Sequence, residues 1–208
     1  MKEFWNDRYH EDGWAYGIEP NAFVKEQLDI IKLQCEPSST QLLFPAEGEG
    51  RNAVYAAKLG FDVCAFDISE AGKEKALQLA KSNHVLIDYQ INGFDKVNYI
   101  ENQFDGIVFC YTHFPAEIQP KFIQSMMQFV KPGGKIIFEC FSENNLPYRQ
   151  KNPQVGGPDN VNMLYTVQSV KSLFEGCQKM EVTEVITQLN EGKYHVGEAC
   201  VVRMIGIK

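Results

Sequence analysis

The sequence predicts an α/β fold: a doubly wound, mostly parallel sheet with helices on both faces and an antiparallel hairpin at its C-terminal end. Two observations predict it. Apolar segments of strand length alternate with helical patterns from residue 41 to residue 141, and two strand-like segments then flank a short glycine-containing turn. Such alternation requires crossovers between parallel strands, which place helices on both faces of the sheet.

The expected elements follow one another without a linker or an internal repeat. Strands are expected at 41–46, 61–66, 84–91, 104–111 and 134–141, and helices at 51–59, 69–83, 116–130 and 166–176. Lys-Pro-Gly-Gly at 131–134 predicts a helix end and a tight turn, because proline cannot continue a helix. Residues 179–189 and 193–208 form the hairpin, with Asn190-Glu191-Gly192 as its turn. The polar segment 142–165 is either a functional loop or disordered.

Composition narrows the class of protein. A chain of 208 residues with 44% hydrophobic residues is expected to form one globular domain. The net charge of -7 is dispersed and there is no lysine or arginine run, so we expect no nucleic-acid partner. The polar N-terminus and the absence of a long apolar stretch predict a cytoplasmic protein with no membrane partner. Six cysteines and four histidines lie far apart, which disfavours a metal site.

A cofactor motif occupies residues 42–69, LLFPAEGEGRNAVYAAKLGFDVCAFDIS. It matches a dinucleotide fingerprint if alanine replaces the third glycine (Gly48, Gly50, Ala53). With NAD, the helix beginning near Gly50 would hold the pyrophosphate and Asp67 the ribose hydroxyls. Asp67 could instead cap the following helix, for which Ser69 is also placed. The glycines alone do not decide between cofactors.

Glu47 favours a cationic cofactor. A carboxylate about 4 Å from a pyrophosphate charge is unfavourable by roughly 4 kcal/mol at an effective dielectric constant of about 20. S-adenosylmethionine has no phosphate and carries a sulfonium and an ammonium group, so the same carboxylate would attract it. Glu49 either adds to this field or points to solvent.

The motif resembles that of class I S-adenosylmethionine-dependent methyltransferases, especially the tellurite-resistance and thiopurine-methyltransferase-like branch. The similarity extends over nearly the whole chain, through FWNDRY, YGIEPNAFV, FDGIVFCYTHFP, VKPGGKIIFECF and GEACVVRMIGIK. It implies a Rossmann-like, seven-stranded sheet in a single domain, 1–208, with 1–36 as a helical cap over the cofactor site. It also implies a small-molecule methyl acceptor and a monomer or homodimer.

By position, the resemblance implies a cofactor site made by Tyr16, Glu47, Gly48, Gly50, Asn52, Asp67, Ile68, Asn92, Gly93, Phe94, Cys110 and Tyr111. Glu47 and its glycines would line the methionine portion, Asp67 the ribose, and Tyr111 the sulfonium. Asn92 stands where the family usually has an acid facing the adenine. Phe44 and Ala46 replace an acid and a first glycine, so either Glu47 supplies the carboxylate or cofactor binding is weak or lost.

Methyl transfer from a sulfonium mainly requires alignment of the reacting atoms, with little acid-base chemistry. His113 and Tyr16 are the predicted catalytic residues, although His113 could simply hold its loop. His195 is expected to be a packed or surface residue. The sequence therefore predicts a methyltransferase of a small thiol, selenium or tellurium acceptor. A family member that binds S-adenosylmethionine without turnover, and an NAD-dependent oxidoreductase, are the alternatives.

Overall fold

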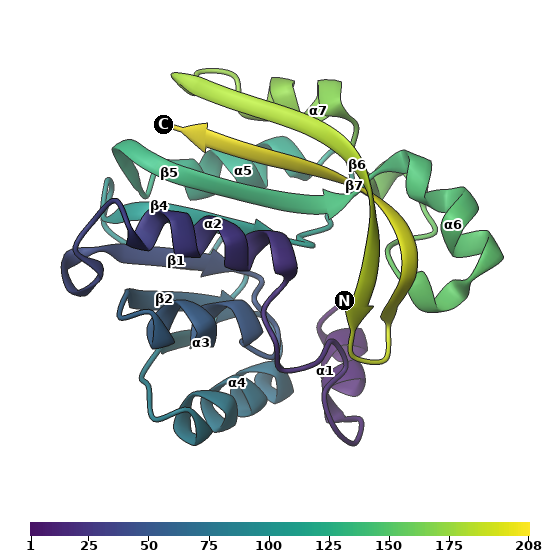
Figure 1. Ribbon diagram of the computed structural model, residues 1–208, viewed down its shortest axis with the longest axis horizontal. Helices are drawn as coiled ribbons and strands as arrows, with labels where there is room; N and C mark the ends of the chain where they lie inside the picture. Colours follow the sequence, from purple (N-terminus) through teal and green to yellow (C-terminus); the bar gives the residue numbers. More distant parts are fainter.

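The computed structural model describes all 208 residues and holds one seven-stranded sheet in the order β3-β2-β1-β4-β5-β7-β6 (Figure 1). Strands β1 to β5 are parallel, and β7 lies antiparallel between β5 and β6. The predicted fold class is confirmed. The strands are β1 (Gln41–Pro45), β2 (Asp62–Asp67), β3 (Asp88–Ile91), β4 (Phe104–Cys110), β5 (Val130–Phe141), β6 (Lys179–Glu191) and β7 (His195–Ile207).

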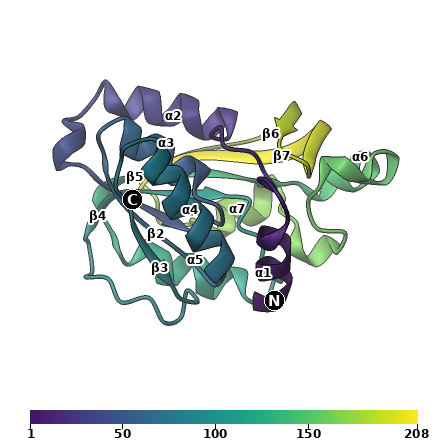
Figure 2. The ribbon, with the colours of Figure 1, turned by 90° about the horizontal axis from the view of Figure 1, so that it is seen from below.

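Helices cover both faces of the sheet, as Figures 1 and 2 show. Helices α2, α3 and α4 cover one face, and α5 and α7 cover the other, while α1 packs against α4 near the tip of the β6–β7 hairpin. The helices are α1 (Lys2–His10), α2 (Ala22–Lys32), α3 (Arg51–Lys58), α4 (Glu70–Ser82), α5 (Gln119–Met127), α6 (Leu146–Lys151) and α7 (Val167–Leu173). None of these helices combines the length and the hydrophobicity that a membrane span requires.

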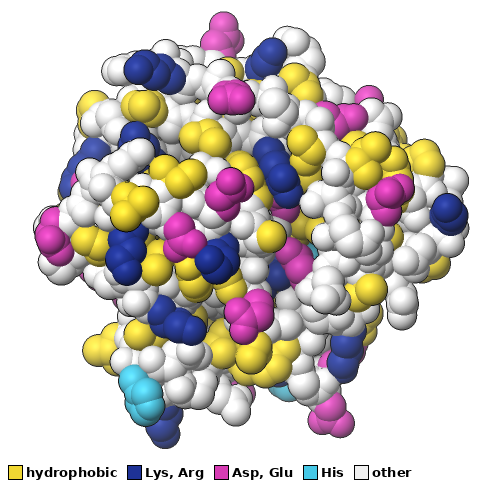
Figure 3. All heavy atoms as spheres, in the orientation of Figure 1, with side chains coloured by type: hydrophobic (Ala, Val, Ile, Leu, Met, Phe, Trp, Pro, Cys, Tyr) yellow, Lys and Arg dark blue, Asp and Glu magenta, His cyan; other side chains and the backbone are white.

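Alternation along the central strands produces two apolar cores, one on each face. Leu43, Ile107 and Phe109 point toward α5 and α7, whereas Leu42 and Phe44 point toward α2 and α3. Phe44, which departs from the family pattern, is fully buried and fills part of the core under α2. Opposite charges intermingle on the face shown in Figure 3, where no large patch of one sign is visible.

Several strand boundaries differ from the prediction. Strand β5 begins at Val130 and includes residues 131–134, which were expected to form a turn. Strand β3 begins at Asp88, because helix α4 ends in a left-handed turn at His84 (φ 57°) and β2 pairs only with residues 88–91. Strand β6 extends to Glu191, two residues further than expected, whereas β7 begins at His195, two residues later than expected. Glu191 pairs with His195 as the last rung of the ladder. The turn is therefore residues 192–194, and it brings two ionisable side chains together at the hairpin tip.

Residues 142–165 form an ordered, compact segment that packs against the rest of the protein. It contains α6 and three single-turn 3-10 helices, Glu143–Asn145, Pro153–Val155 and Val161–Met163. Val155 and Leu164 are buried with Phe141 at the carboxyl end of β5. This segment therefore packs beside the end of the sheet where ligands bind in open α/β folds.

Candidate functional site

The loop between β1 and α3 contains three residues with positive φ: Ala46 (51°), Gly48 (61°) and Gly50 (84°). Gly50 needs to be glycine for a second reason, since a Cβ there would lie 2.9 Å from the Cα of Ala76 in α4. Ala46 adopts the left-handed conformation despite its Cβ, which costs about 1 kcal/mol. The loop therefore keeps the conformation of a glycine-rich turn even though its first glycine is replaced.

Glu47 lies at the N-terminus of α3. Its Oε1 accepts hydrogen bonds from the backbone N–H groups of Asn52 and Ala53, both at 2.8 Å. Burial raises the pKa of Glu47 to about 7, against the lowering effect of those two N–H groups. Glu47 thus caps a helix through one oxygen, while its other oxygen makes no hydrogen bond within the chain.

Asp67, at the end of β2, is bonded to the same loop. Its Oδ2 accepts from Gly48 N–H at 3.1 Å and its Oδ1 accepts from Ser69 N–H at 2.9 Å. Ser69 itself caps α4, through the N–H of Gly72. Burial raises the pKa of Asp67 to about 6. A carboxylate offers about four acceptor positions, so two remain for a pair of hydroxyl groups.

Glu49 does not point to solvent, which was one of its two predicted orientations. It is buried (4% exposed) and accepts from the backbone N–H groups of Ala15 at 3.2 Å and Tyr16 at 3.3 Å. Lys75 of α4 donates to the same carboxylate at 3.0 Å. Glu49 therefore holds the segment between α1 and α2 against the cofactor loop, and its charge is already paired.

Tyrosines from other elements pack around Gly48. A Cβ on Gly48 would collide with the hydroxyl and ring of Tyr9 from α1, and Tyr89 donates a hydrogen bond to the Gly48 carbonyl at 2.6 Å. The rings of Tyr9 and Tyr16 meet edge to face, with centroids 6.4 Å apart. Helix α1 consequently lies directly over the glycine turn in this structure.

A buried polar network lies beside the loop. We use this name for Asn21, Arg51, Tyr111, Glu139, Glu191 and His195. Arg51 donates to Glu191 at 2.9 Å, and Asn21 donates to Glu139 at 2.6 Å and to Glu191 at 3.0 Å. Its members come from the N-terminal segment, α3, the end of β4, β5 and the hairpin tip. The network joins five separate parts of the chain next to the cofactor loop.

His195 is packed, which was one of its two expected positions, but its contact with Glu191 was not predicted from the sequence. The Nδ1 of His195 lies 3.0 Å from the Glu191 carboxylate, and His195 is only 5% exposed. Arg51 and His195 hold the pKa of Glu191 low, at about 2, against the raising effect of its burial. The sequence prediction placed the hairpin turn at residues 190–192. Had it placed the turn at 192–194, it would have predicted that Glu191 and His195 pair with each other.

The residues expected around the adenine and sulfonium are only partly brought together. The N–H of Asn92 donates to the Asp67 carbonyl at 3.0 Å, which places residue 92 beside the ribose acceptor. Phe94 instead packs edge to face against Phe122 in the core beneath α5. Tyr111 (φ 54°) stacks on Phe141 with ring centroids 4.7 Å apart, inside the buried polar network. Ile68, Gly93 and Cys110 adjoin these residues in the chain and are all partly exposed.

His113 has a backbone partner at each ring nitrogen. Its Nδ1 lies 2.8 Å from the Met163 carbonyl, and its Nε2 accepts the N–H of Phe141 at 3.2 Å. Burial lowers its pKa to about 4, so the ring is neutral near pH 7. Tyr165 fastens the same segment, since its hydroxyl donates to the Thr112 carbonyl at 2.8 Å. These contacts describe a residue that holds a loop, and they do not favour the catalytic role predicted for His113.

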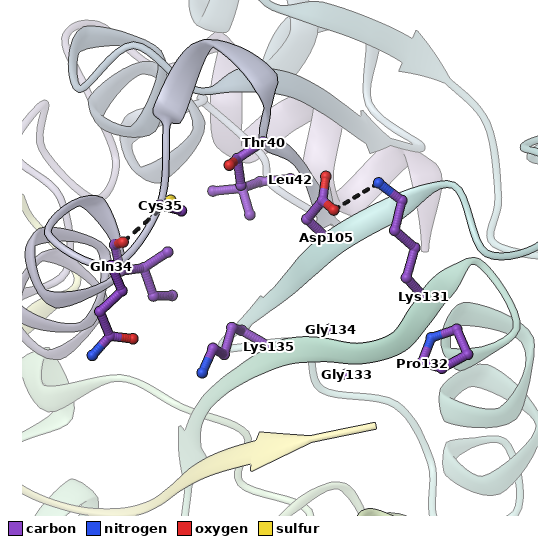
Figure 4. Close-up of a pocket in the computed structure, with 11 residues that line it drawn as sticks. Gln34, Cys35, Thr40, Leu42, Asp105, Lys131, Pro132, Gly133, Gly134 and Lys135 are labelled. Atoms are coloured by element: carbon purple, nitrogen blue, oxygen red, sulfur yellow. Dashed lines mark hydrogen bonds and ion pairs between the residues drawn. The ribbon is translucent and has the colours of Figure 1, made fainter.

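A cavity of about 230 Å³ opens elsewhere, at the amino ends of β1, β4 and β5 (Figure 4). Thr40, Asp105 and Lys135 are among its lining residues, and Lys131 pairs with Asp105 at 2.6 Å. Ligands in open α/β sheets bind at the carboxyl ends of strands. This cavity is therefore on the wrong edge of the sheet to serve the cofactor loop.

Comparison with known proteins gives consistent results. Residues 45–134 match the family described as a methyltransferase domain. Three uncharacterized methyltransferases of Schizosaccharomyces pombe are 24% identical over 119 residues, which is 56% of this chain and 74% of each relative.

Solved structures share the fold. One, described by the conversion of a disulfide bond into a thioacetal group during echinomycin biosynthesis, has a TM-score of 0.74 at 13% identity, covering 100% of this chain and 91% of the other. TehB of Haemophilus influenzae has a TM-score of 0.66 at 17% identity, covering 100% and 66%. Magnesium protoporphyrin IX methyltransferase of Synechocystis, solved with bound SAH, has a TM-score of 0.65 at 12% identity, covering 98% and 96%. Together the comparisons show a methyltransferase-domain match over residues 45–134 and the fold of solved methyltransferases, and they imply S-adenosylmethionine as the cofactor.

Proposed function

We propose that this protein transfers the methyl group of S-adenosylmethionine to a small molecule with a soft nucleophile, such as a thiol or a selenium or tellurium compound. The observation that carries the proposal is the charge of the cofactor loop. Two partly unsatisfied carboxylates, Glu47 and Asp67, stand at the carboxyl ends of β1 and β2, and the loop's own cation, Arg51, is paired with Glu191. Such a site suits a cofactor that is cationic and carries no phosphate.

The residues present fit the chemistry of that cofactor. Asp67 has acceptor positions left for the two ribose hydroxyls, and the backbone of Gly48 lies next to Tyr9, where no side chain on residue 48 could fit. The free oxygen of Glu47 would accept from the ammonium group, which favours the ionised form of a carboxyl whose pKa is about 7. When bound, the cofactor supplies an activated methyl group on a sulfonium.

The chain itself would mainly orient and enclose the reactants. Glu49 holds residues 15 and 16 over the loop, and the backbone of Gly17 packs against Gly192 at the hairpin tip. The segment and the hairpin would thus exclude water above the reacting atoms. Tyr9 contacts Gly48, so we expect α1 to shift when the methionine portion of the cofactor enters.

One structure of the same fold and the aromatic surroundings of His195 support the choice of a soft, polarizable acceptor. The structure related to echinomycin biosynthesis shows that this fold can serve a reaction at sulfur atoms. In our protein, aromatic rings from Tyr16, Tyr111 and Phe141 surround His195 beside the loop, which suits a polarizable acceptor. The tellurite-resistance branch, a cytoplasmic location and a monomeric or homodimeric state remain predictions.

Methyl transfer can be measured directly. We would incubate the protein with S-adenosylmethionine and, separately, 2-mercaptoethanol, 4-nitrothiophenol, sodium selenide and sodium telluride, and detect methylated products by mass spectrometry. We expect methylation of at least one acceptor by the wild type and none by Asp67→Ala. Cofactor binding without any product would favour the alternative, a family member that binds S-adenosylmethionine without turnover. The observation that supports this alternative is the contact of Tyr9 with Gly48, where the methionine portion of the cofactor is expected to bind.

A further inference from the structure

We propose that His195, oriented by Glu191, is the general base that removes a proton from the methyl acceptor. The inference rests on the proposed function and narrows it: the acceptor is a nucleophile that is neutral at pH 7, a thiol or a phenol, and not a selenide or telluride anion. Glu191 acts through His195 and is a positioning residue.

The hydrogen bonds of His195 leave one ring nitrogen free. Nδ1 lies 3.0 Å from the Glu191 carboxylate, an acceptor-only group, so Nδ1 carries the proton and Nε2 presents a lone pair. Nε2 makes no hydrogen bond within the chain. Among fully buried side-chain nitrogens and oxygens, only the Tyr99 hydroxyl lacks a hydrogen-bond partner. Because Nε2 of His195 also lacks a partner, it is not fully buried and retains contact with solvent. His113 differs in this respect, because both of its nitrogens are occupied.

Gly156 of the 142–165 segment lies beside that nitrogen. A Cβ on Gly156 would lie 2.7 Å from Cδ2 and 3.2 Å from Nε2 of His195, so only glycine lets this segment approach the imidazole so closely. The rings of Tyr16 and Tyr111 flank the imidazole, each with its centroid 4.5 Å away. Tyr111 follows β4, where the resemblance places the sulfonium. The free nitrogen is thus next to the expected position of the transferred methyl.

The charged groups around His195 keep it neutral before the reaction. Burial lowers its pKa, and Arg51 and Arg8 lower it further, whereas Glu191 raises it. His113 is the other histidine close enough to interact with it, and the titratable rings of Tyr16 and Tyr111 flank it. The imidazole is therefore unprotonated at neutral pH and able to accept a proton, and the carboxylate of Glu191 would stabilise the imidazolium that forms.

The step balances without another reactant. A lone pair on the acceptor's sulfur or oxygen forms the new bond to the methyl carbon, and the carbon–sulfonium bond breaks with its electron pair remaining on the cofactor's sulfur. The proton of the acceptor moves to Nε2 of His195. Solvent then receives that proton when the products leave, and the neutral dyad is restored.

The kinetic test compares acceptors that differ in protonation. 2-Mercaptoethanol and 4-methylphenol are neutral at pH 7, whereas 4-nitrothiophenol is already a thiolate. We expect His195→Gln to slow methylation of the neutral acceptors by about 100-fold or more, and to change methylation of the thiolate by less than about threefold. The exposed His84→Asn is the matched control and should leave both unchanged. Equal losses for both kinds of acceptor, or no loss, would overturn the proposal.

The pH profile distinguishes a base from a packing residue. For a neutral acceptor, the rate should fall on acidification below the pKa of His195, and in Glu191→Gln this acidic limb should move to lower pH because Glu191 raises that pKa. Nitrogen-15 NMR of the imidazole, recorded without cofactor, should show a proton on Nδ1 and a titration that coincides with the limb. A proton on Nε2, or a limb that ignores the substitution, would contradict the assignment.

The outcomes also separate this inference from the proposed function. If the wild type binds cofactor and methylates only the thiolate or the selenide, the proposed function stands and the base is refuted. If the wild type methylates none of these acceptors, the proposed function fails and this inference fails with it.

Discussion

The guanidinium of Arg51 and the carboxylate of Glu191 form an ion pair of 2.9 Å, with side chains only 7% and 11% exposed, across 140 positions of the sequence. Arg51 is the first residue of α3, directly after the cofactor loop, and Glu191 is the last residue of β6. The pair therefore fixes the hairpin tip against the loop. It also removes the loop's positive charge from the place where a cationic cofactor would bind.

Breaking this pair from one side should be costly. Arg51→Met leaves the carboxylate of Glu191 buried without its main cation, so we expect a loss of about 3–5 kcal/mol in the free energy of unfolding, measured with urea. The double variant Arg51→Met with Glu191→Gln should recover more than half of that loss. Lys25→Met breaks the exposed pair with Asp29 and is the control, with a much smaller effect expected. A double variant no more stable than Arg51→Met would contradict the assignment.

Glu49→Gln should loosen the segment between α1 and α2. The amide side chain is a weaker acceptor for the N–H groups of Ala15 and Tyr16 and loses the ion pair with Lys75. We expect faster hydrogen exchange at residues 15 and 16, measured by mass spectrometry, and faster dissociation of the cofactor. The exposed Glu26→Gln serves as control. Unchanged exchange at these two amides would show that Glu49 does not hold the segment.

The buried carboxyls predict an unusual pH dependence of stability. Folding raises the pKa of Glu47 from 4.5 to about 7 and that of Asp67 from 3.8 to about 6. The folded protein thus binds more protons than the unfolded chain in these ranges. As the pH rises through each range, each of the two groups lowers the free energy of unfolding by about 3 kcal/mol.

The substitution Glu47→Gln imitates the protonated carboxyl and should remove its share of that slope. At pH 5 the variant should be nearly as stable as the wild type, and at pH 8 it should be more stable. Urea unfolding from pH 5 to pH 8 measures the difference. A variant that is less stable at pH 8 than the wild type would mean that the carboxylate of Glu47 stabilises the empty loop.

Substitutions in the turn test whether Ala46 impairs the site. Ala46→Gly removes the Cβ from a left-handed residue and should stabilise the protein slightly, by less than about 1 kcal/mol, without loss of cofactor affinity. Gly48→Ala should abolish cofactor binding and destabilise the protein, because its Cβ would collide with Tyr9. Thermal unfolding and calorimetry measure the two effects. Weaker cofactor binding by Ala46→Gly would show that alanine is required at this position.

Local patterns predicted the sheet because each strand is a short apolar run with its own turn signals, and the parallel order followed from the intervening helices. The run from His84 to Ile87 misled the prediction of β3, since its residues have the character of a strand but no partner in β2. Leu86 is in fact 92% exposed. An apolar run therefore indicates a strand only where a neighbouring strand can pair with it.

The candidate site was predictable where the motif is local and hidden where it depends on distant contacts. Asp67 and the glycines of the loop lie where their spacing predicted. The orientation of Glu49 depends on Lys75 and on a segment that precedes the sheet, and the role of Glu191 depends on Arg51. These partners are remote in the sequence, so composition and spacing could not identify them.

Cofactor binding tests the central claim most directly. Isothermal calorimetry with S-adenosylmethionine and S-adenosylhomocysteine should show saturable binding to the wild type, and Asp67→Ala should weaken it by at least tenfold, the equivalent of about 1.4 kcal/mol lost with the ribose contacts. NADH should produce no heat. An absence of heat with either S-adenosyl compound at millimolar concentration, or equal affinity in Asp67→Ala, would contradict this account of the site.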